Sequence, residues 1–396
     1  MKALSVSKIV EKVIKNVKRY GDKALLRYTI KFDQIKNFSS KDLKVKIEKL
    51  PKLEDKNFIK SINLAIKNIR KFHMEELKNL KRNWSVSNNG IKTGQKFLPV
   101  DSVGIYIPGG KYGFNYISTL LMTVIPAQVA GVRKIVLVTP PKNVTNYFLY
   151  TAYILGIKEI YQIGGAQAVA ALAFGTKTVP KVDMIVGPGN IWVTEAKRQL
   201  IGKVGIDMIA GPSEVVVVGD GSFSLKEIIY ELLAQAEHDK DAKSYFISYD
   251  KNVIKEVKKY LIKNAKEFLN RIKIIYEKNL QNICKIIDEI APEHLTLLTK
   301  YQKKILAKVK NAGAIFSGSC PSAVFGDYVA GPSHVLPTNS TAKFSSGLCV
   351  GSFFKKISIV EISKKGAKNL VAATSILAEK EGMVWHKNRV DIYKTF

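Results

Sequence analysis

The stretch Val103-Gly-Ile-Tyr-Ile-Pro-Gly-Gly110 decides the fold, because it joins a short apolar run to a tight glycine turn. Residues 103–107 are apolar without polar alternation, which predicts a strand buried on both faces. A helical pattern follows at 116–129, and a second apolar strand follows at 134–138. A strand, a crossover helix and another strand in this order indicate a parallel sheet.

The same alternation continues along the chain. Strands are expected at 159–163, 184–186, 215–218, 244–248, 314–316 and 357–362, and helices at 144–155, 164–174, 190–198, 224–238 and 369–381. Charged helical patterns fill 5–80, with a weaker link at 32–55, and also 253–290, whereas the glycine-rich segment 326–334 predicts a loop. We therefore predict an α/β fold with two Rossmann-like doubly wound parallel-sheet domains and helical N-terminal and C-terminal extensions. The predicted domains are a helical lead-in (1–98), a nucleotide-binding-like domain (99–212), a second α/β domain (213–344) and a C-terminal extension (345–396).

Three strands of the first domain run into glycine-rich turns, at 108–110, 164–165 and 187–189. The carboxyl ends of parallel strands are where open α/β sheets hold ligands, and the backbone amides of such turns suit a phosphate. No GxGxxG motif is present, so a nucleotide site and ordinary turn chemistry both remain open from the turns alone.

The chain of 396 residues carries 63 Lys and Arg against 33 Asp and Glu, a formal charge of +30. Such an excess raises the alternative of a basic nucleic-acid-binding protein on a retained α/β scaffold. The lysines are spread over almost every predicted helix, which favours solvated helix faces instead. Three separated cysteines without a CxxC motif fit a reducing compartment, and neither a secretory signal nor a membrane span is expected, so we predict a cytoplasmic location.

The segment Gln235-Ala-Glu-His238 could contribute to a metal site. Ser224 and Glu227 have capping-box spacing, and they predict an amphipathic helix that carries Gln235 at the border of its apolar stripe and His238 further out. An amide oxygen and an imidazole at i, i+3 can bind one divalent cation if other segments supply ligands. An ordinary polar helix end remains the alternative for these residues alone.

Taken together, the motifs resemble those of the histidinol dehydrogenase family. The resemblance covers nearly the whole chain, and the matching segments occur in the family's order. They are 103–110, 164–175, 187–190, 193–198, 210–214, 235–238, 292–295, 326–328, 334–337 and 381–388. The resemblance implies the oxidation of L-histidinol to L-histidine in two NAD-dependent steps through a bound aldehyde, at the end of histidine synthesis.

Residue by residue, the resemblance implies one zinc ion per subunit bound by Gln235, His238, Asp327 and His386. These N and O donors suit zinc, and the carboxylate partly balances its charge. The family is homodimeric, and its C-terminal tail crosses to the partner, so His386 is expected to complete the site of the other subunit.

The resemblance also assigns the remaining site residues. Glu293 and His294 match the acid–base pair, in which His294 takes the hydroxyl proton and Glu293 activates the water that adds to the aldehyde. The expected substrate contacts also include Ser213, Gln235, His238, His294, Asp327, Glu381, His386 and, more weakly, His334. The expected NAD contacts are Tyr106, Gln167 and Asn190, at the glycine-rich strand ends.

Overall fold

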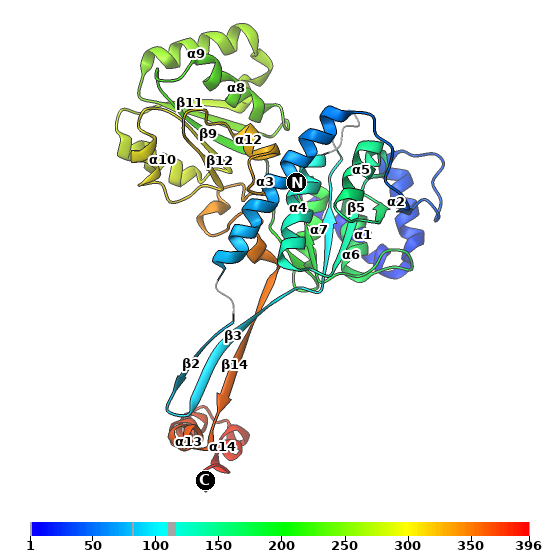
Figure 1. Cartoon of the computed structure of the whole chain (residues 1–396), viewed down its shortest axis with the longest axis vertical. Coiled ribbons are helices and arrows are strands. Elements are labelled where there is room, and N and C mark those ends of the chain that lie inside the picture. Colours follow the sequence, from blue (N-terminus) through cyan, green and yellow to red (C-terminus); the bar gives the residue numbers. More distant parts are fainter. Residues whose placement is uncertain (1, 81–82, 110–115, 396) are drawn as a thin grey trace.

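The computed structural model describes residues 2–80, 83–109 and 116–395, and it contains two parallel-sheet units and a long arm (Figure 1). The first sheet has the strand order β1-β6-β5-β4-β7-β8. All of its neighbouring strands are parallel except β1, which pairs antiparallel with β6. The bounds are β1 (Lys44–Lys46), β4 (Ser102–Tyr106), β5 (Lys134–Thr139), β6 (Glu159–Gln162), β7 (Met184–Val186) and β8 (Gly205–Ile206). The chain reverses its winding direction between β4 and β7, which makes this the sheet's topological switch point.

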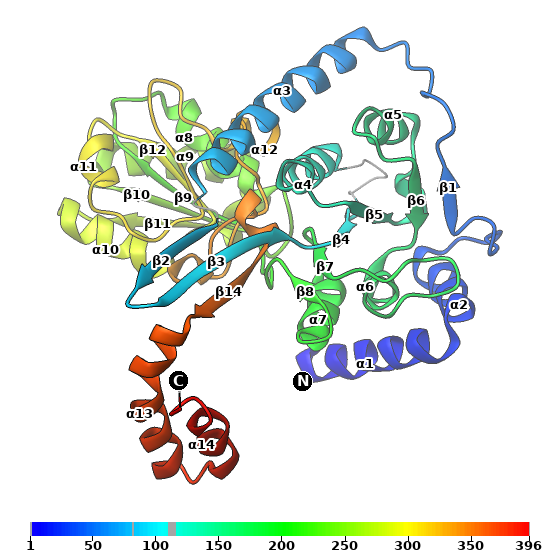
Figure 2. The same ribbon diagram turned by 60° about the horizontal axis from the view of Figure 1, so that its bottom comes forward.

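Helices cover both faces of the first sheet (Figure 2). One face packs against α1 (Lys2–Tyr20), α2 (Asp22–Asp33), α6 (Gly165–Phe174) and α7 (Ile191–Leu200). The other face packs against α3 (Lys56–Asn79), α4 (Ile117–Ala130) and α5 (Asn146–Ile154). Because apolar residues cover the sheet on both sides, the strands read as continuous apolar runs.

The second sheet is wholly parallel, in the order β11-β10-β9-β12-β13. Its strands are β9 (Glu214–Gly219), β10 (Lys243–Ser248), β11 (Ile272–Tyr276), β12 (His294–Leu298) and β13 (Ala314–Phe316). The helices α8 (Leu225–Ala236) and α9 (Lys251–Asn264) pack on one face, and α10 (Leu280–Ile290) and α11 (Gln302–Leu306) pack on the other. The short helix α12 (Ala323–Tyr328) follows β13. Short 3-10 helices lie at Pro141–Asn143, Lys266–Arg271, Thr341–Lys343 and Val350–Phe353.

An antiparallel arm projects away from both sheet units (Figure 1). Its strands are β14 (Phe354–Ile362), β3 (Ile91–Pro99) and β2 (Trp84–Asn88), in that order. The arm bears α13 (Lys364–Lys380) and α14 (Val384–Asp391) at its tip. Within the described chain, no helix combines the length and apolar character that a bilayer crossing requires.

The predicted fold class is confirmed, but four local predictions need correction. The lead-in is not purely helical, because it contains β1, β2 and β3. Strand β11 interrupts the helical segment predicted at 253–290, and the loop predicted at 326–334 begins inside α12. Helix α8 ends at Ala236, so His238 lies in the following turn, where its N–H donates to the Gln235 carbonyl at 3.2 Å.

The strand corrections at β3 and β11 have one physical cause, which is that a partner strand elsewhere in the chain stabilises each of them. Strand β3 pairs with β14 over nine residues, from Ile91 with Ile362 to Pro99 with Phe354. Strand β11 is an edge strand whose sequence Ile-Lys-Ile-Ile-Tyr carries little alternation, and it is held by β10. Such contacts override local pattern and propensity.

Candidate functional site

A cavity of about 1890 Å³ lies between the two sheet units. The first sheet contributes its carboxyl edge, through Tyr106 at the end of β4 and the turns that follow β6 and β7. The second sheet contributes its amino edge, because Ser213 precedes β9 and His294 begins β12. The two units therefore present opposite edges of their sheets to one shared cleft.

The other edge of the second sheet is closed by a buried carboxylate. Asp220 follows β9 and is 3% exposed. It accepts hydrogen bonds from the hydroxyl groups of Ser222, Tyr249 and Thr299 and from the Lys300 N–H, which follow the carboxyl ends of β9, β10 and β12. This polar network fills the position that open α/β sheets use for ligands. The first sheet is therefore the one whose carboxyl edge opens into the cleft.

Glu293 and His294 form a buried acid–base pair at the amino end of β12. The two residues are 6% and 4% exposed. The Glu293 carboxylate accepts a hydrogen bond from the Glu214 N–H at 3.1 Å, and its Oε2 lies 3.9 Å from His294 Nδ1. His294 Nε2 lies 3.6 Å from Asp327 Oδ1. One imidazole thus stands between two carboxyl groups without a short hydrogen bond to either.

Burial shifts the pKa values of this pair in opposite directions. The pKa of Glu293 is raised to about 8, chiefly by burial and also by the charge of Asp327. Hydrogen bonds from the Glu214 N–H and the Ser213 side chain partly oppose this rise. Burial lowers the pKa of His294 to about 3, helped by the nearby imidazoles of His238 and His334. The site therefore holds a neutral imidazole beside a carboxyl group that titrates near neutrality, which suits proton transfer.

Three of the four predicted zinc ligands line this cleft: Gln235, His238 and Asp327. Gln235 is 4% exposed, and its Nε2 has no hydrogen-bond partner among the described residues. Burial raises the pKa of Asp327 to about 7, and the charge of Glu231 adds to this rise. A buried carboxyl group with a raised pKa, beside an imidazole and an amide, fits a divalent cation, whose charge would stabilise the carboxylate form.

Glu381 and His386 lie elsewhere. Glu381 follows α13 and His386 belongs to α14, and both are exposed at the tip of the arm (Figure 1). Accordingly, no group of three or more His, Cys, Asp or Glu residues within the described chain is arranged to hold a metal. A single chain brings together only part of the predicted ligand set.

His334 joins the site through two contacts. Its Nδ1 lies 2.9 Å from the Asp327 carbonyl, and its Nε2 lies 3.1 Å from the hydroxyl of Thr119 on α4. Burial lowers its pKa to about 4. His334 therefore links the helix that carries Asp327 to the first sheet unit.

The predicted NAD contacts line the opposite part of the cleft. The Tyr106 hydroxyl accepts a hydrogen bond from the Gly165 N–H at 3.1 Å, at the start of α6. Gln167 is 1% exposed, and neither polar atom of its carboxamide has a partner among the described residues. Asn190 caps α7 by accepting from the Trp192 N–H at 3.1 Å.

Two glycines shape these turns. Gly165 has a φ of +63°, and Gly187 has a φ of +113°. A Cβ at Gly187 would collide with the Tyr106 carbonyl. The close approach of the turn to β4 therefore requires glycine. Gly110, from the first predicted turn, lies outside the described residues.

The lead-in contributes to the cleft, although none of the predicted site residues lies in it. Tyr28 and Asp33 of α2 line the same cavity. Asp33 is the last residue of its helix, where the helix dipole disfavours a negative charge. Its Oδ2 is buried without a partner among the described residues, and burial raises its pKa to about 6. An acidic residue at the C-terminus of a helix is the sequence signal that could have identified Asp33.

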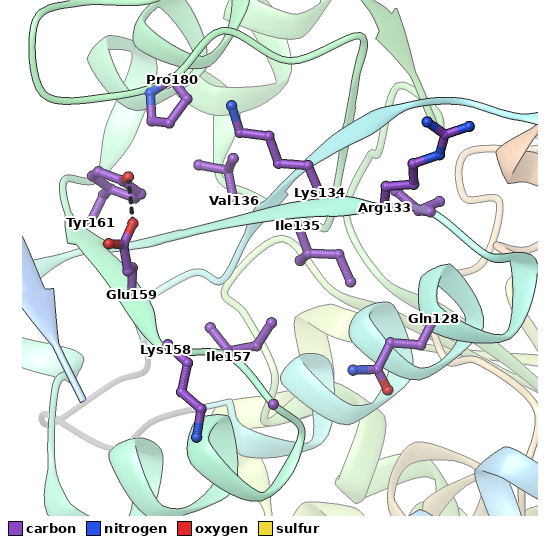
Figure 3. A pocket seen from close by; sticks show the side chains of 12 residues that line it. Gln128, Arg133, Lys134, Ile135, Val136, Ile157, Lys158, Glu159, Tyr161 and Pro180 are labelled. Carbon is purple, nitrogen blue, oxygen red and sulfur yellow. Dashed lines mark hydrogen bonds between the residues drawn. The ribbon is translucent and has the colours of Figure 1, made fainter. Parts of the chain in front are cut away.

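A second hollow, of about 380 Å³, lies at the amino ends of β5 and β6 (Figure 3). It includes the exposed cations Arg133, Lys134 and Lys158. The Tyr161 hydroxyl donates to Glu159 at 3.3 Å inside it. None of the predicted site residues lines this hollow.

The fold and the cleft define a two-domain α/β enzyme, with a buried acid–base pair beside glycine turns suited to a dinucleotide. Comparison with known proteins specifies the family. The protein-family model described as histidinol dehydrogenase matches residues 1–393 of this chain. The chain therefore belongs to the histidinol dehydrogenase family.

Individual relatives agree with this assignment. The chain is 45% identical to histidinol dehydrogenase from Caldanaerobacter subterraneus subsp. tengcongensis, covering 98% of this chain and 92% of the relative. It is 42% identical to the enzyme from Oceanobacillus iheyensis, covering 98% and 93%. The crystal structure of histidinol dehydrogenase from Elizabethkingia anophelis is similar with a TM-score of 0.87 and 35% identity, covering 98% of this chain and 92% of that one. These comparisons do not support the nucleic-acid-binding alternative.

Proposed function

We propose that this chain catalyses the zinc-dependent, four-electron oxidation of L-histidinol to L-histidine through histidinal, with two NAD, as the final step of histidine biosynthesis in the cytoplasm. The observation that carries the proposal is the shared cleft, which places the buried Glu293–His294 pair beside Gln235, His238 and Asp327. The names of the relatives support the same reaction.

In this proposal, NAD lies along the carboxyl edge of the first sheet. Tyr106 holds the Gly165 turn, and the unpartnered carboxamide of Gln167 offers both a donor and an acceptor to the dinucleotide. The amide group of Asn190 offers a further donor, since its oxygen already caps α7. Because the corresponding edge of the second sheet is closed by Asp220, the two NAD molecules use one site in succession.

Zinc would be held by Gln235, His238 and Asp327 of one subunit together with His386 of a second copy. When bound, it supplies a positive charge that orients the amino alcohol in the cleft. Glu381 is exposed on the same tail as His386, and its carboxylate suits a contact to the cationic amine of the substrate. Ser213 and His334 would complete the substrate pocket.

The proton transfers are assigned to the buried pair. As a hydride leaves the alcohol carbon for NAD, the neutral imidazole of His294 accepts the hydroxyl proton and the aldehyde forms. Glu293, as carboxylate, then takes a proton from the water that adds to the aldehyde carbon. His294 returns its proton to the oxygen of the former aldehyde, which gives the hydrated aldehyde. A second hydride then passes to a second NAD while the neutral imidazole of His294 accepts one hydroxyl proton of the hydrate, which leaves the carboxylic acid product.

A homodimer with exchanged tails is proposed because the arm isolates two expected site residues from the cleft of their own chain. The tip of the arm exposes apolar side chains, namely Ile376, Leu377, Met383, Val384 and Trp385. The described surface of α12, close to the cleft, exposes Val324, Phe325 and Tyr328. Covering both sets with one contact would bury apolar surface and bring His386 to the partner.

Two measurements test the proposal. NADH formation from L-histidinol is expected with the zinc-loaded protein, to be lost on chelation and to return with zinc. Separately, inactive Asp327→Ala and His386→Ala proteins are expected to regain activity when their subunits are exchanged, because a mixed dimer contains one intact site. Absence of turnover under any metal condition would refute the reaction, and absence of complementation after verified exchange would refute the shared site.

A further inference from the structure

Glu231 is a buried carboxylate that the proposed chemistry does not use. It lies on α8, one turn before Gln235, and is 6% exposed. It accepts hydrogen bonds from the hydroxyls of Thr296 and Ser322, each at 2.7 Å, and from the Ala323 N–H at 2.6 Å. Both of its oxygens are therefore engaged.

These three bonds join the elements that carry the site. Thr296 lies on β12, two residues after His294, and Ala323 is the first residue of α12, which carries Asp327. A helix of six residues has little stability of its own, and its first N–H groups need partners from outside the helix. Glu231 supplies one of those partners from α8, the helix that carries Gln235. A single carboxylate thus fixes α12 to both α8 and β12.

Fold stability alone does not explain a charged acceptor at this position. The three groups that donate hydrogen bonds to Glu231, from Thr296, Ser322 and Ala323, are all neutral. Burying a charge among neutral groups is costly, and well-packed apolar residues often replace such groups without loss. The hydrogen bonds of Glu231 instead connect the helix that carries Gln235 with the start of the helix that carries Asp327.

We infer that Glu231 is a positioning residue for the zinc site: its buried carboxylate orients Asp327 relative to Gln235. The inference rests on the proposed function, because it presupposes that Asp327 and Gln235 bind zinc. Glu231 touches neither the substrate nor the reacting atoms in this account.

Zinc affinity, measured by competition with a chromophoric chelator, tests the inference without relying on turnover. Glu231→Gln keeps the side-chain shape but removes the charge, and zinc affinity is expected to fall about 10- to 100-fold. Asp220→Asn is the matched control, because it removes another buried carboxylate that accepts hydroxyl hydrogen bonds, at the opposite edge of the same sheet. The control protein is expected to keep the affinity of the unaltered protein.

If Glu231→Gln fails to fold, Ser322→Ala removes one bond on the α12 side and leaves the other two, and a smaller loss of zinc affinity is expected. Unfolding midpoints measured without metal identify folded variants. Equal zinc affinity in folded Glu231→Gln, or an equal loss in Asp220→Asn, overturns the role of Glu231 and leaves the proposed function intact. Failure of the unaltered protein to bind zinc overturns both.

Discussion

The buried carboxyl group of Glu293 is expected to cost the protein stability at neutral and alkaline pH. Burial raises its pKa from the ordinary value of 4.5 to about 8. The folded protein therefore keeps a proton that the unfolded chain releases above about pH 4.5. The contribution to stability is complete below that pH and is lost as the pH rises through about 8. The gap between the two pKa values corresponds to up to about 5 kcal/mol of unfolding free energy.

Glu293→Gln tests this reasoning, because glutamine keeps an oxygen that can accept from the Glu214 N–H and cannot ionise. In metal-free protein at one fixed concentration, urea unfolding midpoints of the two proteins are expected to be similar at pH 5. At pH 8 the variant is expected to be the more stable, while it loses activity. A stability difference of the same size at both pH values would show that Glu293 does not hold its proton in the folded state.

Three further perturbations test other parts of the account. Tyr106→Phe removes the hydroxyl that holds the Gly165 N–H, so the KM for NAD is expected to rise several-fold in steady-state kinetics; an unchanged KM would remove the tyrosine from the nucleotide site. Lys197→Met removes the ammonium group that lies 2.6 Å from the buried Asp207 carboxylate, so the free energy of unfolding measured by thermal unfolding is expected to fall by about 3–5 kcal/mol. An unaltered unfolding midpoint would show that the ion pair does not stabilise the fold. Asp327→Asn is expected to lower the zinc content measured by elemental analysis while NAD binding measured by calorimetry is retained; full zinc content would exclude Asp327 as a ligand.

The sheets could be predicted from sequence because their strands are encoded locally. The apolar runs of β4, β5 and β9 are buried on both faces, and the helices α4, α5 and α6 between them are rich in apolar residues. The capping box of Ser224 and Glu227 is present as expected. Of the arm's strands, only the one at 357–362 was predicted, and it lies within β14. Strands β2 and β3 could not be predicted in this way, because β3 depends on a partner strand some 260 residues away and β2 is exposed along its whole length.

Some features of the candidate site could likewise be predicted from the sequence, and others could not. Glu293, His294, Gln235, His238 and Asp327 were assigned by motif resemblance, and the cleft contains all of them. The shifted pKa values of Glu293, His294 and Asp327 depend on burial between two sheet units, which no local pattern encodes. The participation of α2 in the cleft likewise depends on how the lead-in packs on the first sheet.

The yield of NADH per L-histidinol shows whether this cleft carries out both oxidations. With zinc-loaded protein, excess NAD and a limiting, known amount of L-histidinol, we expect two NADH for each substrate molecule and L-histidine as the product. One NADH with accumulated aldehyde, or none, would contradict the assignment of both oxidations to this cleft.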